Sequence, residues 1–98
     1  MSVIFTRVGT PLPGRLGQAA AFMKQRAEAI NSNYGVEVAL NARFGGPVGQ
    51  MAMVSYHDGL AELEDIRRRI IADVGAGKLP TPEPGIFHHS NDAIWMRL

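Results

Sequence analysis

The chain has 98 residues, 46% of them hydrophobic, so it is long enough for one domain, residues 1–98, with a modest core. With 10 Lys and Arg, 9 Asp and Glu and no Cys, the composition excludes strong attraction to nucleic acid or anionic membranes, disulfide bonds and thiol catalysis. No stretch approaches the ~18 apolar residues of a membrane span and no basic signal segment opens the chain, so we expect a cytoplasmic protein.

The first half of the chain predicts two strands separated by a helix. Residues 3–8 are β-branched and aromatic, as in a strand, and Gly9 and Pro11 are expected to break it. Apolar residues then recur at helical spacing between residues 16 and 30, and the helix is expected to end near Gly35, which tolerates a left-handed cap. Residues 36–44 alternate apolar and polar side chains with the period of a strand.

A hairpin is expected next, because Gly45-Gly46-Pro47 is a turn signal that leads into a strand over residues 51–56. This strand is apolar on both faces, with Met51 and Met53 on one face and residues 52, 54 and 56 on the other. A strand of this kind requires cover on both sides of its sheet.

The clearest helix pattern spans residues 58–74. Asp58 is predicted to cap the helix with its side-chain oxygen. Acidic residues near the start and arginines further on suit the helix dipole, and they form the i,i+4 pairs Glu64 with Arg68 and Asp65 with Arg69. The apolar positions form one stripe, which consists of Leu60, Leu63, Ile66, Ile70 and Val74.

After this helix, Gly75 is expected to supply the C-terminal cap, and three prolines between residues 80 and 84 predict an extended connector. Ser90-Asn91-Asp92 predicts a turn, and residues 93–98 alternate as in a terminal strand. The order is therefore βαββαβ. This order predicts an α+β, ferredoxin-like fold, in which an antiparallel sheet carries both helices on one face.

Three segments carry a resemblance: residues 13–16 (PGRL), 44–50 (FGGPVGQ) and 60–64 (LAELE). They resemble small members of the dimeric α+β barrel superfamily, which holds the antibiotic-biosynthesis monooxygenases and the NIPSNAP-like proteins. The resemblance implies a homodimer in which two sheets meet by their helix-free faces. The residues agree, because two helices cover only one side of a sheet whose strands are apolar on both sides.

Several motifs are rejected as carriers of chemistry. Residues 75–78 (GAGK) end a helix and lack the Ser or Thr of a phosphate-binding loop. The run of arginines at 67–69 is interpreted as a solvated face. Ser55 and Ser90 lack the context of a nucleophile elbow. Haem-degrading relatives take an axial histidine from the second helix, and since residues 60–74 contain none, that activity is not expected.

The histidines are the best titratable candidates. Because neighbours on a strand face opposite sides, Tyr56 and His57 are not expected to share a pocket, and at most one of His88 and His89 is expected to point inward. The alternative for each histidine is a surface or hydrogen-bonded structural role. No metal site and no cofactor are expected. The catalytic candidates are His57, His88, His89 and Arg43.

The resemblance implies a small, flat, apolar ligand between sheet and helices. Residues available to line such a space are Phe22, Met23, Phe44, Met51, Met53 and Trp95, although an ordinary core explains them better. Arg7 and Arg43 lie on mostly apolar strands, where they can meet a carboxylate or enolate or pair with Glu37 across the dimer. The ligand-binding candidates are Arg7, Asn41, Tyr56 and Trp95.

Two functions remain open at this point. One is a cofactor-independent oxygenase or isomerase acting on a small aromatic or polyketide-like compound, with a histidine as base and an arginine stabilising developing negative charge. The other is a non-catalytic homodimer that binds a ligand or serves as an accessory subunit. A cavity faced by both a histidine and an arginine favours the first function.

Overall fold

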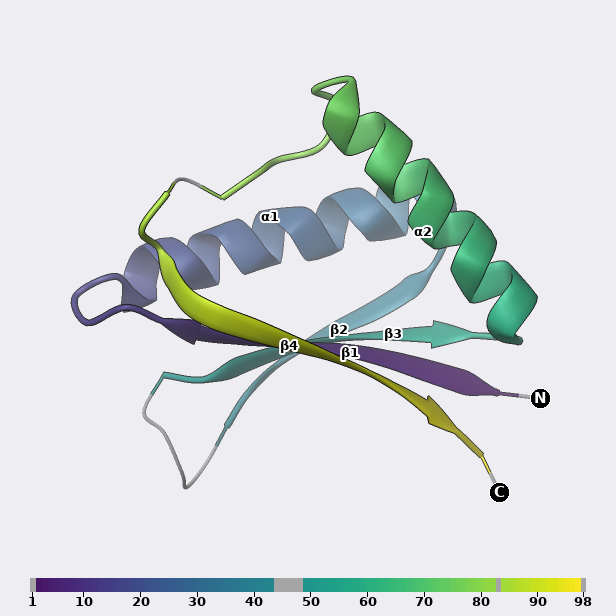
Figure 1. The fold of residues 1–98 in the computed structure, drawn as a ribbon, viewed down its shortest axis with the longest axis horizontal. Coiled ribbons are helices and arrows are strands. Elements are labelled where there is room, and N and C mark those ends of the chain that lie inside the picture. Colours follow the sequence, from purple (N-terminus) through teal and green to yellow (C-terminus); the bar gives the residue numbers. More distant parts are fainter. Residues whose placement is uncertain (1, 44–48, 83, 98) are drawn as a thin grey trace.

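The computed structural model describes residues 2–43, 49–82 and 84–97. Its four strands form one antiparallel sheet in the order β2-β3-β1-β4, and both helices lie on the same face of that sheet (Figure 1). This confirms the predicted ferredoxin-like α+β fold. Neither helix of the described residues is both long and apolar enough to cross a membrane. The elements are β1 (Val3–Pro11), α1 (Leu16–Tyr34), β2 (Glu37–Ala42), β3 (Met51–His57), α2 (Leu60–Gly75) and β4 (Phe87–Met96).

The register of β1 against β3 decides which side chains share a face of the sheet. Val3 pairs with His57, Phe5 with Ser55 and Arg7 with Met53, so these six residues project toward the helices. Their neighbours in sequence project to the opposite side, which no helix covers (Figure 1). We call this side the open face. It is formed by Ile4, Thr6, Val8, Glu37, Ala39, Asn41, Ala52, Val54, Tyr56, Asn91, Ala93 and Trp95.

The core lies between the helices and the sheet. Each helix contributes the middle of its predicted apolar stripe, whereas Leu16 and Leu60, at the helix starts, are about half exposed. The buried stripes are therefore shorter than the sequence predicts. Buried members of the core are Ala19, Met23, Ile30, Val36, Met51, Met53, Ile66 and Ile86.

The helix ends differ in part from the prediction. Gly35 has the predicted left-handed conformation, with φ of 66°, and donates its N–H to the carbonyl of Asn31. The predicted cap by the Asp58 side chain is wrong, because Gly59 is the cap residue of α2 and no side chain caps it. Instead, the N–H of Asp58 donates to Glu62 Oε2 at 3.2 Å, so Glu62 binds the residue before the cap and not the cap residue itself. Gly75 is the last residue of α2 and not its cap.

The last strand is longer than the sequence predicts. The predicted turn at residues 90–92 is wrong, because β4 runs unbroken along nearly all of β1. The local turn preference of Asn and Asp is weak compared with a continuous ladder of backbone hydrogen bonds. Likewise, β1 continues through Gly9 to Pro11, which pairs with Phe87 after a register shift. The predicted turn at residues 45–47 lies outside the described residues, as does Phe44.

Candidate ligand pocket

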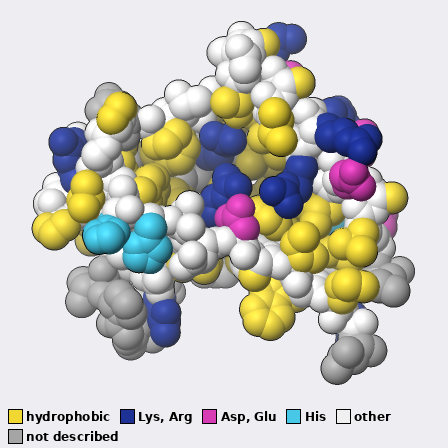
Figure 2. Space-filling model, viewed as in Figure 1, with side chains coloured by type: hydrophobic (Ala, Val, Ile, Leu, Met, Phe, Trp, Pro, Cys, Tyr) yellow, Lys and Arg dark blue, Asp and Glu magenta, His cyan; other side chains and the backbone are white. Residues whose placement is uncertain are grey.

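A pocket of about 300 Å³ lies between the helix-covered face of the sheet and the two helices. Its wall is mostly apolar, with side chains from β1, β2, β3 and both helices. Figure 2 shows a hollow on this side of the molecule in which Lys or Arg side chains lie among hydrophobic ones. Such a mixture of apolar wall and few polar groups is typical of small-molecule sites. The polar residues of the wall are Arg7, Arg26, Ser55, His57 and Arg67.

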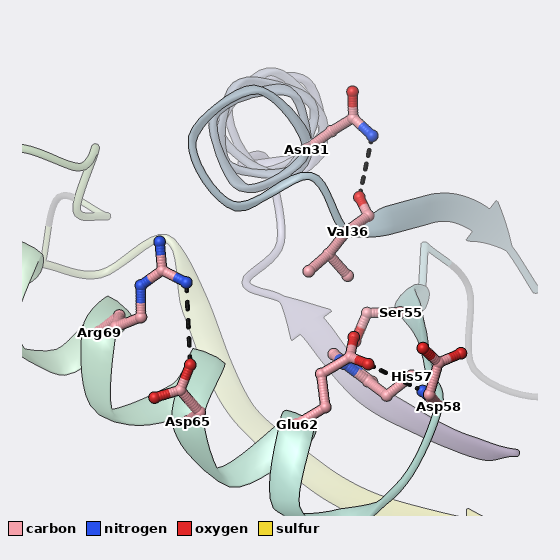
Figure 3. Close-up of polar contacts among 8 residues, drawn as sticks. All are labelled: Asn31, Val36, Ser55, His57, Asp58, Glu62, Asp65 and Arg69. Carbon is pink, nitrogen blue, oxygen red and sulfur yellow. Dashed lines mark hydrogen bonds and ion pairs between the residues drawn. The ribbon is translucent and has the colours of Figure 1, made fainter. Parts of the chain in front are cut away.

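His57 reaches this pocket from the end of β3. Its Nε2 lies 2.7 Å from the Ser55 hydroxyl oxygen, and its Nδ1 lies 3.8 Å from Glu62 Oε1 at the start of α2. Figure 3 shows Glu62 approaching His57 from the helix and Asp58 following it on the chain. The two-residue period of β3 brings Ser55 and His57 to one face, and the first turn of α2 brings Glu62 to them.

The His57 side chain is only 1% exposed, and its Nδ1 has no hydrogen-bond partner among the described residues. Burial lowers the pKa of His57 below its ordinary value, and the nearby carboxylates of Glu62 and Asp58 only partly oppose this effect. The imidazole is therefore neutral near pH 7. With its proton on Nδ1, which faces Glu62, it presents Nε2 as a proton acceptor.

This lowered pKa predicts a loss of stability in mild acid. The unfolded chain binds the His57 proton more tightly than the folded chain, so the free energy of unfolding should fall as the pH drops below about 6.5. The loss should grow until the pH reaches the folded pKa. We expect the urea midpoint of the wild type to fall more between about pH 7.5 and about pH 5.5 than that of His57→Gln. An equal fall in both proteins would contradict a buried, neutral His57.

Arg7 enters the pocket from β1 and is held by an ion pair with Asp92 of β4. Its Nε and Nη2 donate to the two carboxylate oxygens at 2.8 and 2.9 Å. These hydrogen bonds raise the pKa of Arg7 and lower that of Asp92. The guanidinium also lies 5.8 Å from the centre of the Phe5 ring, within the range of a cation–π contact. Arg7 is thus fixed on one side of the pocket.

The structure places the other predicted site residues outside this pocket. His88 and His89 are exposed on β4, with their Nδ1 atoms 3.1 Å apart. Asn41 and Arg43 line a separate hollow, where Arg43 donates to the Gln50 side chain. Tyr56 and Trp95 project from the open face, and the Trp95 indole N–H donates to Thr6 Oγ1 at 3.3 Å. Of the predicted site residues, the pocket contains His57 and Arg7.

The pocket also contains polar residues that the sequence analysis missed, namely Arg26, Ser55 and Arg67. A signal for the arginines is present in the chain. Arg26 follows Met23 by three residues and precedes Ile30 by four, so it lies on the apolar stripe of α1.

Arg67 follows Leu63 by four residues and precedes Ile70 by three, which places it in the same way on the stripe of α2. Ser55 is in phase with Met53 and His57 on β3. No cluster of three His, Asp or Glu side chains that could hold a metal ion occurs in residues 2–43, 49–82 and 84–97.

Fold and pocket together define a small ferredoxin-like α+β protein with a ligand-sized space between its sheet and its helices. Solved structures of NIPSNAP family proteins share this fold. One from Agrobacterium tumefaciens has a TM-score of 0.80 and 12% identity, over 100% of this chain and 94% of that one. A NIPSNAP domain protein from Burkholderia xenovorans has a TM-score of 0.79 and 11% identity, over 98% of this chain and 94% of that one.

A second NIPSNAP family protein from Agrobacterium tumefaciens, of unknown function, has a TM-score of 0.76 and 17% identity, over 96% of this chain and 86% of that one. At such low identity these similarities show the fold alone. These three structures give no link to the antibiotic-biosynthesis monooxygenases. No protein-family model matches the sequence, and no curated protein matches it either.

Proposed function

We propose that this protein is a small enolising enzyme, which removes a proton from the carbon next to a carbonyl group of a small, largely apolar compound. The observation that carries the proposal is the presence of a buried, neutral histidine and of arginine side chains in one apolar pocket. A base with a pKa near or below neutrality and a cation for the developing oxyanion are the two groups that such a reaction needs.

In the proposed reaction, His57 Nε2 takes the proton from the substrate carbon, and Ser55 gives up its hydrogen bond to that nitrogen. Glu62 lies 3.8 Å from Nδ1, so its carboxylate stabilises the imidazolium that forms. An arginine of the pocket stabilises the negative charge on the enolate oxygen. Return of the proton to a different carbon gives an isomerase. In a cofactor-independent oxygenase, the enolate instead transfers one electron to O₂, and the two radicals combine to a carbon-bound peroxide. This peroxide takes up a proton and loses water, so that the methylene carbon becomes a new carbonyl group.

A non-catalytic ligand carrier is the second candidate. It is favoured by the depth of His57, whose side chain is almost fully buried and already in contact with Ser55. In a carrier, the contact between Ser55 and His57 is structural, and the pocket binds a ligand without changing it. The two functions differ in one measurable property, which is proton exchange on a bound ketone.

Hydrogen exchange in D₂O distinguishes the two candidates. The probe is benzoylpropionate, a flat aromatic ketone with an enolisable methylene group, and loss of its methylene proton signal is followed by NMR. We expect the wild type to accelerate the exchange and His57→Gln to slow the enzymatic rate by about 100-fold or more, because the base is lost. His88→Gln, a matched change of an exposed histidine outside the pocket, should keep the wild-type rate.

Binding of the probe without accelerated exchange would contradict the enolising function and favour the carrier. Exchange that is equally fast in His57→Gln would remove His57 from the reaction. Binding is measured in the same samples by the broadening and shift of the aromatic signals of the probe.

We further propose that the protein works as a homodimer, in which the open face of one copy packs on that of a second copy. The support comes from the row of side chains that Ile4 forms with its strand partners Tyr56 and Trp95. Tyr56 is 41% exposed and Trp95 is 61% exposed, although both are large and aromatic. Contiguous apolar surface of this kind usually marks an interface, and a two-fold arrangement is the commonest way to cover it with a second copy.

A further inference from the structure

The pocket carries an unusual excess of positive charge. One arginine enters it from each of three elements: Arg7 from β1, Arg26 from α1 and Arg67 from α2. Among the described residues that line the pocket, none is Asp or Glu. Arginine stays protonated at any physiological pH, so the three charges cannot be relieved by loss of protons.

The partners of these arginines leave most of this charge uncompensated. Asp92, at the edge of the pocket, forms a two-pronged ion pair with Arg7. Arg26 is half-buried and donates to the carbonyl oxygen of Pro80 at 2.8 Å, which is a neutral acceptor. Arg67 has no carboxylate within ion-pair distance among the described residues. One carboxylate therefore faces three guanidinium groups.

The positive charge of Arg7 acts on both Arg26 and Asp92. Burial lowers the pKa of Arg26, and the positive charge of Arg7 lowers it further. The hydrogen bonds from Arg7 are the main cause of the lowered pKa of Asp92, and the charges of Arg7 and Arg67 lower it further. Arg67 is exposed and the Arg7 side chain is 40% exposed, so water and salt weaken the repulsion between the arginines. A bound anion is nevertheless attracted by all three charges.

Arg67 lines the same pocket as the proposed proton acceptor. Its guanidinium carbon is 5.3 Å from the centre of the Phe5 ring. Phe5 is the direct strand partner of Ser55, the residue in contact with His57 Nε2, and paired residues of antiparallel strands are about 5 Å apart. Arg67, Ser55 and His57 thus all line one pocket of about 300 Å³, which is the size of a small ligand.

We propose that the ligand of this pocket is a carboxylate on a flat apolar body, with Arg67 and Arg26 binding the carboxylate and the apolar wall binding the rest. This inference rests on the proposed function, since it names the class of compound on which His57 would act. Planar guanidinium groups match the two oxygens of a carboxylate. The cation–π contact with Phe5 holds Arg67 over the pocket before a ligand arrives. Arg7 stays paired with Asp92 and adds its charge from the side.

The test compares benzoylpropionate with its neutral methyl ester, which has the same aromatic ketone. Dissociation constants are measured by calorimetry at low and high salt. We expect the acid to bind the wild type about 10-fold or more tightly than the ester, because only the acid forms charged hydrogen bonds with the arginines. This difference in affinity should become smaller at high salt, because salt screens the charges. We expect Arg67→Gln to remove this advantage and to leave the affinity for the ester unchanged.

Arg68→Gln is the matched control. Arg68 is the next residue of α2, is exposed, and pairs with Glu64 outside the pocket, so its loss should change neither affinity. Thermal melting of both variants shows whether either change disturbs the fold. Equal binding of acid and ester by the wild type, or equal weakening of both in Arg67→Gln, would overturn the inference.

Hydrogen exchange separates a failure of this inference from a failure of the proposed function. If the ester binds and exchanges as well as the acid, the enolising function stands and the carboxylate preference is wrong. If the acid binds through Arg67 without exchange, the carboxylate site stands and the enolising function is wrong. If the wild type binds neither compound, both proposals are contradicted.

Discussion

Replacing Trp95 with Asp is expected to convert the proposed homodimer into a monomer or into insoluble protein. Trp95 is 61% exposed in the single chain, so a carboxylate at this position is solvated in the monomer and costs the fold little. In a dimer joined by the open face, the same carboxylate would be buried without a partner, which costs several kcal/mol. Light scattering on a sizing column should give twice the chain mass for the wild type and the single-chain mass for the soluble variant.

Leu60→Asp is the control for this experiment. Leu60 is also a large exposed hydrophobic residue, at 48%, but it lies at the start of α2 on the helix side of the molecule. The same change of charge there should leave the mass of the assembly at that of the wild type. A wild type that runs as a monomer at micromolar concentration, or a Trp95→Asp variant that still dimerises, would contradict the proposed interface.

Leu63→Ala should lower the free energy of unfolding by about 2–5 kcal/mol, because it removes three buried carbon atoms and leaves a cavity. Leu63 is 3% exposed and lies on the buried side of α2, above the sheet. Urea denaturation followed by circular dichroism measures the change, with an unchanged slope and a lower midpoint as the expected result.

Arg68→Ala on the same helix should cost only a few tenths of a kcal/mol. Arg68 is exposed and its ion pair with Glu64, at 2.6 Å, lies in solvent. The two variants therefore separate the buried side of α2 from its solvated side. Similar urea midpoints for Leu63→Ala and Arg68→Ala would show that the apolar stripe of α2 does not face the core.

The helices were predictable because their pattern is local. The recurrence of apolar residues every three to four positions defines α2, and the structure buries Leu63 and Ile66 from that stripe. The strand β4 was only partly predictable. Residues 90–92 have the composition of a turn, and only pairing with β1 across the sheet makes them a strand, with Asp92 held by Arg7. That ion pair joins residues from opposite ends of the chain.

The pocket was less predictable than the fold. His57 and Arg7 were named from their residue types and their positions on strands, but six other named residues lie outside the pocket. Strand alternation separates Tyr56 from His57 without saying which of them faces the helices. The arginines at 67–69 are exposed, as the sequence predicts, but Arg67 also lines the pocket because its spacing from Leu63 and Ile70 places it beside the apolar stripe.

The sequence by itself determined the order of strands and helices and their amphipathic patterns, because hydrogen bonding and burial within a helix or strand repeat with a short period along the chain. Only the tertiary structure decided which face of the sheet the helices cover. The faces of β3 are both apolar, with Met53 on one and Val54 on the other, so no local pattern distinguishes them. The same packing places Arg26, Arg67 and His57 in one pocket. These residues lie apart in sequence, so only the packing of the two helices on the sheet brings them together.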